Sequence, residues 1–374
     1  MTEYLGKETF KLGFGFMRLP KNKDGTTDTE QVKQMVDRFM EAGGTYFDTA
    51  YVYGNGDSEK AMKVSLVDRY PRESYTICTK LNAWMQAHDE ASAKEQFYTS
   101  LERTGAGYFD YYLLHGLQET NYHLYDEYHL WDFVKEQKEK GLIRHWGFSY
   151  HASPELLERL LNEHPEVDFV QLQINYADWD NPNVAARKNY EICCAHGKPI
   201  TVMEPVKGGA LADPIPSVQK IMKDADPDAS FASWAIRYVA SMDGIITVLS
   251  GMSALEQMED NLSYMKDFKP LSEAEQEVIR KVQEALREGT EIPCTACHYC
   301  TEGCPMQIAI PEIFAAVNEF RRYKNPVHFR RNYGLATLNG GKADQCIACG
   351  QCEGACPQQL PIIELLKNTV EELR

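Results

Sequence analysis

The sequence predicts an α/β protein, in which a parallel (β/α)8 barrel (a TIM barrel) is followed by a small, helix-rich second domain. Three observations support this fold class. The chain has 374 residues, which suits a barrel of about 250 residues plus a smaller unit. Short apolar runs alternate with amphipathic stretches over most of the chain. Eight of the 11 cysteines gather near the C-terminal end in two groups.

The strand candidates are short runs rich in β-branched and aromatic residues, as expected for strands that are covered on both faces. Eight such runs lie at residues 12–15, 45–49, 75–80, 108–114, 144–149, 167–173, 199–204 and 244–250. A doubly wound sheet is the alternative, but no G-x-G-x-x-G opens a helix after the first strand. GNG at 54–56 follows the second strand and lacks the third glycine. Eight strand–helix units therefore favour the barrel.

The stretches between the strand candidates carry helical periodicity. TEQVKQMVDRFMEAGG (29–44) ends in a glycine stop signal, and Ser153 is the expected N-cap of SPELLERLLNEH (153–164). LSEAEQEVIRKVQEALREG (271–289) reads as the last helix before the first cysteine group, and IPEIFAAVNEFRRY (310–323) is a helix between the two groups. We therefore expect a barrel domain at 1–288 and a helix-rich domain at 289–374.

Composition excludes several classes of protein. Hydrophobic residues make up 43% and charged residues 25% of the chain, as in a soluble globular protein with a large core. The net charge of −16 gives no electrostatic case for binding nucleic acid. There is no run of about 18 apolar residues, and the N-terminus lacks the basic start and apolar core of a signal peptide. We expect no nucleic-acid partner, no membrane span and a cytoplasmic location.

The two cysteine groups have one spacing. CTACHYCTEGCP (294–305) and CIACGQCEGACP (346–357) both read C-x2-C-x2-C-x3-C-P. Close clustering in a chain without a signal peptide argues for metal binding rather than disulfides. Zinc is the alternative, but zinc sites usually pair two C-x-x-C units. The spacing is that of bacterial ferredoxins, so we expect a ferredoxin-type domain with two [4Fe–4S] clusters.

The cluster ligands follow from the same spacing. In two-cluster ferredoxins the fourth cysteine of each motif ligates the other cluster. One predicted ligand set is Cys294, Cys297, Cys300 and Cys356. The other predicted set is Cys346, Cys349, Cys352 and Cys304. This crossing ties both motifs into one core.

Four polar residues close or follow predicted strands. Asp48 ends the second strand, Tyr53 lies in the loop after it, Lys80 ends the third strand and His115 ends the fourth. Catalytic groups of such barrels come from the carboxyl ends of strands. Each residue taken singly is more often structural than catalytic, but together they form an acid–base set.

The chemistry of this set is coherent. A tyrosine, with a pKa of about 10, is a poor acid at neutral pH. A lysine ammonium beside a tyrosine favours the phenolate, and an aspartate keeps the lysine charged and in position. Tyr53 is therefore the predicted proton donor to a carbonyl oxygen as hydride reaches the carbon. A neutral His115 would donate a hydrogen bond to the same oxygen.

The segments FDTAYVYGNGDSEK (47–60), TK (79–80), YLLHG (112–116) and GFSYH (147–151) resemble the aldo-keto reductase family. The resemblance covers roughly residues 8–285, and the chain as a whole resembles the members that carry a C-terminal ferredoxin domain. It implies interconversion of a small carbonyl and an alcohol with NAD(H) or NADP(H) laid across the barrel rim.

The resemblance also implies nucleotide contacts. Ser149 and Gln171 would hold the nicotinamide carboxamide. Further contacts, from the pyrophosphate to the adenosine, would come from Glu204, Gly208, Gly209, Gly251, Gln257 and Asn261. Gly251 and Gln257 stand where NADP-preferring members usually have Lys and Arg. A 2′-phosphate needs positive charge, so this segment argues against a preference for NADP(H). The expected cofactor is NAD(H) or NADP(H).

The two halves of the chain handle electrons differently, because a hydride carries two electrons and a cluster accepts one at a time. No flavin fingerprint is visible, but barrels can bind flavin without one, so a flavin is a candidate relay. One hypothesis is a carbonyl reductase or alcohol dehydrogenase whose clusters exchange electrons through a flavin or an electron-transfer protein. The others are an ordinary NAD(P)H-dependent reductase with structural or oxygen-sensing clusters, and a non-catalytic electron-carrier subunit. The complete acid–base set favours the first.

Overall fold

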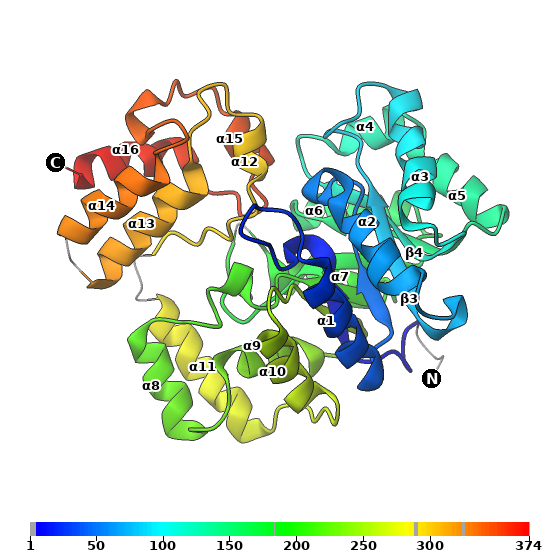
Figure 1. Cartoon of the computed structure of the whole chain (residues 1–374), viewed down its shortest axis with the longest axis horizontal. Helices are drawn as coiled ribbons and strands as arrows, with labels where there is room; N and C mark the ends of the chain where they lie inside the picture. Colours follow the sequence, from blue (N-terminus) through cyan, green and yellow to red (C-terminus); the bar gives the residue numbers. More distant parts are fainter. Residues whose placement is uncertain (1–4, 183, 288–290, 324–325, 374) are drawn as a thin grey trace. The chain divides into compact units, whose positions relative to one another are not determined.

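The computed structural model describes residues 5–182, 184–287, 291–323 and 326–373 (Figure 1). The chain divides into two compact units. The barrel unit comprises Met1–Asn181, Ala185–Pro205 and Ala232–Gln276. The cysteine unit comprises Pro182–Val184, Val206–Phe231 and Glu277–Arg374. The expected boundary between residues 288 and 289 lies outside the described residues, and the cysteine unit also takes in the segment from residue 206 to residue 231.

Eight parallel strands close a barrel in the barrel unit. Each strand pairs with the next one along the chain, and β8 pairs with β1. The strands are β1 Leu12–Gly15, β2 Tyr46–Asp48, β3 Thr76–Leu81, β4 Phe109–Leu117, β5 Ile143–Tyr150, β6 Phe169–Gln173, β7 Ile200–Met203 and β8 Ile245–Ser250. All eight predicted strands are confirmed, and the closed sequential order is that of a TIM barrel rather than a doubly wound sheet.

Helices cover the outer faces of the strands (Figure 1). They are α1 Thr29–Glu41, α2 Asp57–Met62, α3 Glu90–Thr104, α4 Tyr122–Glu127, α5 Leu130–Glu139, α6 Pro154–Glu163, α7 Ala186–Ala195, α9 Phe231–Ala240 and α10 Leu255–Met265. The predicted N-cap of α6 is present, since the Ser153 hydroxyl accepts a hydrogen bond from the backbone N–H of Leu156 at 3.3 Å.

Side chains alternate between the inside and the outside of the barrel along each strand. Tyr46, Cys78, Leu113 and Phe169, one on each of four strands, belong to one buried apolar layer. Because the period is two, the next inward positions of β2, β3, β4 and β6 lie toward the carboxyl ends of the strands. Those positions are Asp48, Lys80, His115 and Gln171. The fold thus stacks a polar layer on an apolar one.

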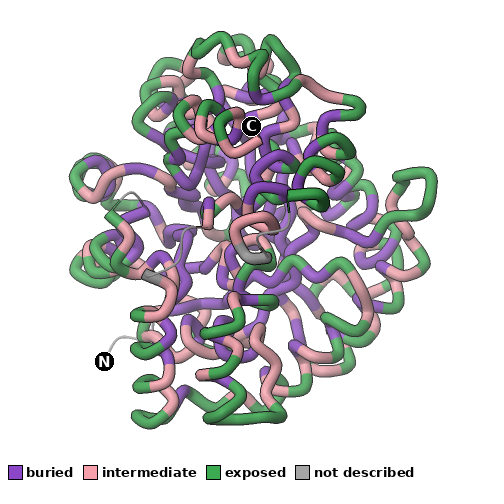
Figure 2. Tube along the Cα trace, turned by 90° about the vertical axis from the view of Figure 1, so that its left-hand side faces the viewer, coloured by how far each residue is buried: buried purple, intermediate pink, exposed green. Residues whose placement is uncertain are grey.

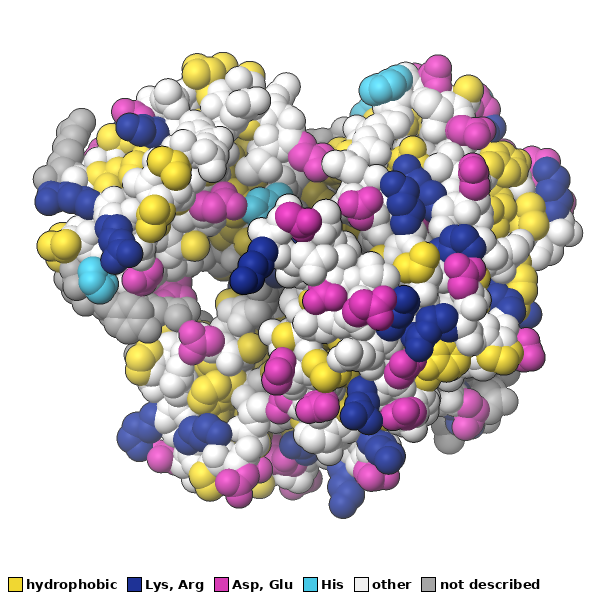
Figure 3. Space-filling model, in the orientation of Figure 1, with side chains coloured by type: hydrophobic (Ala, Val, Ile, Leu, Met, Phe, Trp, Pro, Cys, Tyr) yellow, Lys and Arg dark blue, Asp and Glu magenta, His cyan; other side chains and the backbone are white. Residues whose placement is uncertain are grey.

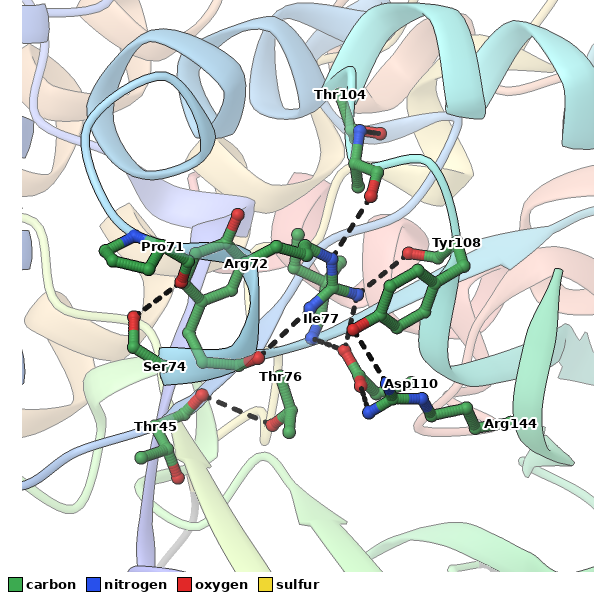
Figure 4. Close-up of polar contacts among 12 residues, drawn as sticks. Thr45, Pro71, Arg72, Ser74, Thr76, Ile77, Thr104, Tyr108, Asp110 and Arg144 are labelled. Carbon is green, nitrogen blue, oxygen red and sulfur yellow. Dashed lines mark hydrogen bonds and ion pairs between the residues drawn. The ribbon is translucent and has the colours of Figure 1, made fainter. Parts of the chain in front are cut away.

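A separate polar cluster lies at the opposite, amino-terminal end of the barrel (Figure 4). The buried Asp110 carboxylate accepts hydrogen bonds from Arg72 at 2.6 Å, from Arg144 at 2.9 Å and from the Ile77 N–H at 3.0 Å. Arg72 also donates to the Tyr108 carbonyl at 2.8 Å. These bonds join the starts of β3, β4 and β5, and polar residues at this end of a TIM barrel serve stability.

Burial follows the strands. Buried positions run through the interior of the molecule, and exposed positions lie at its periphery (Figure 2). Acidic and basic side chains are interspersed on the face shown in Figure 3, where exposed ion pairs contribute little to stability. Among the described helices, none combines the length and the apolar character that a membrane crossing requires.

The cysteine unit is rich in helices, as predicted. Its helices are α8 Pro216–Ala225, most of α11 Glu273–Arg287, α12 Tyr299–Glu302, α13 Ile310–Tyr323, α14 Pro326–Ala336, α15 Gln351–Ala355 and α16 Ile362–Glu372. Helices α13 and α14 lie side by side (Figure 1), with the Phe320 and Phe329 rings stacked at 4.7 Å between centroids. Ile313, Val317 and Leu366 are fully buried in the core of this unit.

Candidate active site and cysteine cavities

A buried ion pair lies at the carboxyl end of the barrel. The Lys80 ammonium donates to the Asp48 carboxylate at 2.6 Å and to the Thr49 carbonyl at 2.7 Å. The Lys80 side chain is 0% exposed, so both charges depend on each other. The Gln171 amide donates to the second Asp48 oxygen at 3.4 Å. Asp48 therefore holds the Lys80 side chain in position through this ion pair.

The two predicted donors lie beside this pair. The Lys80 nitrogen is 5.0 Å from the centroid of the Tyr53 ring. The Tyr53 and His115 rings meet edge to face, with centroids 5.6 Å apart. Tyr53 is partly exposed and His115 is buried. The structure thus gathers all four predicted catalytic residues from β2, the loop after it, β3 and β4.

The loop that carries Tyr53 is held by Ser58, at the start of α2. The Ser58 hydroxyl lies 2.6 Å from the Thr49 hydroxyl and donates to the Phe16 carbonyl at 2.9 Å. Both hydroxyls are buried. These bonds connect the end of β2 to α2 and to the segment after β1, so the ends of the Tyr53 loop are fixed.

Glu59 provides a second anchor for this loop. The fully buried Glu59 carboxylate lies 3.2 Å from Arg103 and accepts a hydrogen bond from Thr79 at 2.8 Å. Burial raises the pKa of Glu59, although both neighbours oppose the shift. Gly56 has a φ of +90°, and a Cβ there would lie 2.5 Å from the Arg103 guanidinium carbon. Gly56, Ser58 and Glu59 therefore fix the backbone of the loop that carries Tyr53.

The surroundings of His115 favour the neutral imidazole through its pKa. Burial lowers its pKa well below the usual range, and the Lys80 ammonium and His151 lower the pKa further. The Nδ1 atom of His115 is buried and has no hydrogen-bond partner among the described residues. Substrate or water commonly satisfies such an atom. The sequence reasoning missed His151, whose own pKa falls to about 4 through burial.

The two predicted nicotinamide contacts are neighbours. Ser149 on β5 and Gln171 on β6 pair directly in the sheet, and both side chains are buried. The Ser149 hydroxyl accepts a hydrogen bond from the Gly116 N–H at 2.7 Å. Gln171 contacts Asp48, so this pair lies beside the four predicted catalytic residues, and its contact with a nicotinamide stays a prediction.

Asn261 and Gln257, which are predicted to contact the adenosine, make hydrogen bonds within the chain. The buried Asn261 amide donates to the Ser250 hydroxyl at 2.7 Å, and its oxygen accepts from the Tyr264 hydroxyl at 2.6 Å. The Gln257 oxygen accepts from the Ser253 N–H at 2.7 Å. Both residues therefore shape the turn between β8 and α10, and their contact with a nucleotide stays a prediction.

Arg18 is a rim residue that the sequence reasoning missed. It follows β1 in the 3₁₀ turn Phe16–Arg18, and its guanidinium lies 3.9 Å from the Glu204 carboxylate. A Cβ built on the exposed Gly251 would lie 3.9 Å from the Arg18 Cβ. The Arg18 Cβ therefore lies beside Gly251, in a segment without basic residues, while the Arg18 guanidinium lies near Glu204. A basic residue directly after a strand end was the available signal.

The remaining predicted contacts lie in the loop after β7. Glu204 has a φ of +56°, and its carbonyl accepts a hydrogen bond from the Asn175 amide at 3.1 Å. Gly208 and Gly209 have φ values of +64° and +100° and belong to the cysteine unit. These backbone conformations favour glycine.

The eight clustered cysteines surround two cavities. The first cavity is lined by Cys294, Cys297, Cys300 and Cys356, and the second by Cys304, Cys346, Cys349 and Cys352. The structure thus groups the cysteines in the crossed pattern expected from their spacing. Among the described residues no three His, Cys, Asp or Glu converge on a single metal ion.

The backbone around the two cavities repeats. Residues with a left-handed φ, between +48° and +80°, occur at equivalent places in the two motifs. The pairs are Ala296 with Ala348, His298 with Gly350, and Gln307 with Gln359. Left-handed non-glycine residues are uncommon and cluster at ligand sites, where they turn backbone N–H groups toward an anion. These loops therefore fit an anionic group such as a thiolate-bound cubane.

Comparison with known proteins finds a family model for each of two parts of the chain. A model of the Aldo/keto reductase family matches residues 11–284, and a model of a 4Fe-4S dicluster domain matches residues 293–360. The uncharacterized oxidoreductase YqkF of Bacillus subtilis is 24% identical over 67% of this chain and 86% of its own length. An aldo-keto reductase of Mycolicibacterium paratuberculosis is 28% identical over 70% of this chain and 84% of its own.

Solved structures share the barrel. The holo form of an aldo-keto reductase from Bacillus halodurans superposes with a TM-score of 0.59 at 24% identity, covering 75% of this chain and 95% of that one. An aldo/keto reductase from Klebsiella pneumoniae, in complex with NADP and acetate, has a TM-score of 0.59 at 19% identity and covers 73% and 91%. The chain therefore belongs to the aldo/keto reductase family of oxidoreductases, and it carries a 4Fe-4S dicluster domain after the barrel.

Proposed function

We propose that this enzyme interconverts a small carbonyl compound and its alcohol with a nicotinamide dinucleotide, and that its two [4Fe–4S] clusters exchange electrons with that reaction. The observation that carries the first part is the buried Lys80–Asp48 pair beside the Tyr53 and His115 rings. The nicotinamide supplies or accepts the hydride. Residues of the chain donate the proton and orient the carbonyl oxygen.

The four residues take distinct roles in this proposal. In the reduction direction the Tyr53 hydroxyl gives its proton to the carbonyl oxygen while hydride adds to the carbon. The Lys80 ammonium stabilises the phenolate that remains, and Asp48 keeps that ammonium in place. Neutral His115 donates a hydrogen bond that orients the same oxygen. In the oxidation direction the phenolate takes the proton back.

The assay of the first part is anaerobic turnover of the iron-loaded chain with NADH or NADPH and a panel of aldehydes and ketones. We expect nucleotide oxidation that depends on the carbonyl compound. A nucleotide that binds but is never oxidised by any carbonyl would favour the non-catalytic carrier instead. Turnover that persists unchanged after the clusters are removed would favour an ordinary reductase with structural clusters.

The choice of nucleotide rests on Arg18. A relative from Klebsiella pneumoniae is in complex with NADP. The Arg18 side chain begins beside Gly251, and in this proposal its guanidinium reaches the 2′-phosphate of the bound nucleotide. We expect Arg18→Met to weaken NADPH binding about tenfold or more, since a hydrogen bond to a charged group contributes about 1.5–3 kcal/mol. NADH binding should change less than about threefold on the same reasoning.

Fluorescence titration of both nucleotides measures this difference. Arg38→Met, which removes an exposed α1 arginine paired with Glu41, is the matched control and should change neither affinity. Equal weakening of NADH and NADPH, or no weakening of either, would contradict the assignment of Arg18 to the 2′-phosphate.

The predicted cluster ligands are the two sets of cysteines that line the cavities. We expect Cys300→Ser to lower the iron and sulfide content by about half, because one of two clusters loses a thiolate. Cys193→Ser, at a buried helix cysteine of the barrel unit, should keep the full content. Iron analysis after anaerobic reconstitution tests this, and full iron in the Cys300→Ser chain would refute the ligand set.

The electron route is the second part of the proposal. Two-electron hydride chemistry and one-electron clusters need a relay, so a bound flavin or an electron-transfer protein completes the scheme. A reducing cytoplasm suits free thiols and iron–sulfur cofactors. The proposal of a relay follows from the difference between two-electron and one-electron transfer. The proposal of a cytoplasmic location follows from the free thiols and the iron–sulfur clusters.

A further inference from the structure

We propose that the Lys207 ammonium belongs to the shell of the first cysteine cavity, raises the reduction potential of the cluster held there, and does not bind the dinucleotide. The inference rests on the proposed function in one respect, namely that a cluster occupies the cavity of Cys294, Cys297, Cys300 and Cys356.

The loop after β7 packs against this cavity. Residues Val206–Phe231 belong to the cysteine unit, and the 3₁₀ turn η5 (Lys207–Gly209) opens that segment. A Cβ at Gly208 would lie 2.5 Å from the Thr295 carbonyl oxygen and 2.8 Å from the Thr295 Cα. Thr295 follows the first cluster cysteine, so the turn touches the cysteine loop with no room for a side chain between them.

The Lys207 side chain contacts a residue that lines the first cavity. Lys207 is only 7% exposed, and its Nζ donates to the Gln358 side-chain oxygen at 3.4 Å. Gln358 is itself 4% exposed and lies two residues after Cys356. Both Gln358 and Thr295 line the first cavity, and neither lines the second. The ammonium is therefore linked through Gln358 to the first cavity and not to the second.

The charges explain why a lysine is buried here. Burying an ammonium is costly unless negative charge or strong acceptors compensate. A cubane held by four thiolates is anionic and becomes more negative on reduction. A nearby cation stabilises the reduced state more than the oxidised state, and net charge and hydrogen bonding around a cluster set its potential. Lys207 should therefore raise the potential of the first cluster selectively.

The test is an anaerobic redox titration of the iron-loaded full chain, followed by electron paramagnetic resonance, with Lys207→Met. At a fixed potential we expect the reduced-to-oxidised ratio of the first cluster to fall about tenfold, which corresponds to about 59 mV for a one-electron couple. Lys220→Met, on exposed α8 of the same unit, is the control for charge alone and should leave both midpoints unchanged.

Two further variants assign the effect. The Cys300→Ser chain keeps only the second cluster, and adding Lys207→Met to it should not move the remaining midpoint. Lys207→Arg keeps the charge and should keep the wild-type midpoint potential of the first cluster. This variant tests the proposal if the Lys207→Met chain loses iron. The affinities of the Lys207→Met chain for NADH and NADPH should stay within about twofold of the wild-type values. The reason is that Lys207 makes no contact with the nucleotide in this proposal.

Several results would overturn the proposal. In Lys207→Met these are an unchanged midpoint potential of the first cluster, equal shifts in the midpoint potentials of both clusters, or a tenfold loss of nucleotide affinity. In Lys207→Arg it is a lower midpoint potential of the first cluster. The titration uses a chemical reductant and needs no carbonyl turnover. Its outcome is therefore independent of whether the barrel reduces carbonyls.

Discussion

Replacing Tyr53 with phenylalanine is expected to lower kcat for carbonyl reduction by about 10²- to 10⁴-fold. Phenylalanine keeps the ring that lies 5.6 Å from His115 and 5.0 Å from the Lys80 nitrogen. It removes the hydroxyl that donates the proton, and it leaves Ser149 and Gln171 in place for the nucleotide. Anaerobic steady-state kinetics should therefore show a loss of kcat, while direct titration should show an unchanged nucleotide Kd.

Tyr51 in the same loop offers a matched control. Its ring lies 4.3 Å from the Arg103 guanidinium. Tyr51→Phe should change kcat less than about twofold, because no proton transfer involves its hydroxyl. Equal losses in both variants would assign the effect to the loop rather than to the Tyr53 hydroxyl, and full activity of Tyr53→Phe would remove it from the mechanism.

The second large effect concerns stability. Lys80→Met should lower the free energy of unfolding by about 3–5 kcal/mol, because it leaves the buried Asp48 carboxylate without its cation. The same substitution should abolish turnover, since the phenolate of Tyr53 loses its stabilising charge. Chemical denaturation under anaerobic conditions gives the first quantity, and steady-state kinetics give the second.

A double variant separates these two consequences. Lys80→Met combined with Asp48→Asn removes both charges, so it should regain most of the lost stability and none of the activity. Lys94→Met, which breaks the part-exposed pair with Glu90 on α3, should cost less than about 1 kcal/mol. Recovery of turnover in the double variant would show that the ion pair is structural only.

The fold was predictable because its signals are local. Each barrel strand is a short apolar run, and each cysteine motif carries its ligand spacing within twelve residues. The largest difference at a strand end is that of β4. β4 continues through His115 to Leu117, past a register shift, and Gly116 has a φ of +69°. His115 and Gly116 interrupt the apolar pattern, so the sequence indicated an end at residue 114.

Other features were not predictable, because they join residues that are distant in the chain. Ser58 bonds to the Phe16 carbonyl, 42 positions earlier. Arg18 approaches Glu204, and Gly208 lies against Thr295. No local pattern marks such pairs. Only the closed barrel and the folded cysteine unit bring them together.

The most direct test of the central claim is an anaerobic titration of the iron-loaded protein with NADH and, separately, with NADPH. Cluster bleaching is followed by visible absorbance, and reduced clusters are followed by electron paramagnetic resonance. We predict that at least one nucleotide reduces the clusters, which joins the barrel and the dicluster domain into one redox chain. Clusters that stay oxidised while the nucleotide demonstrably binds would contradict this account and leave the two domains as separate devices.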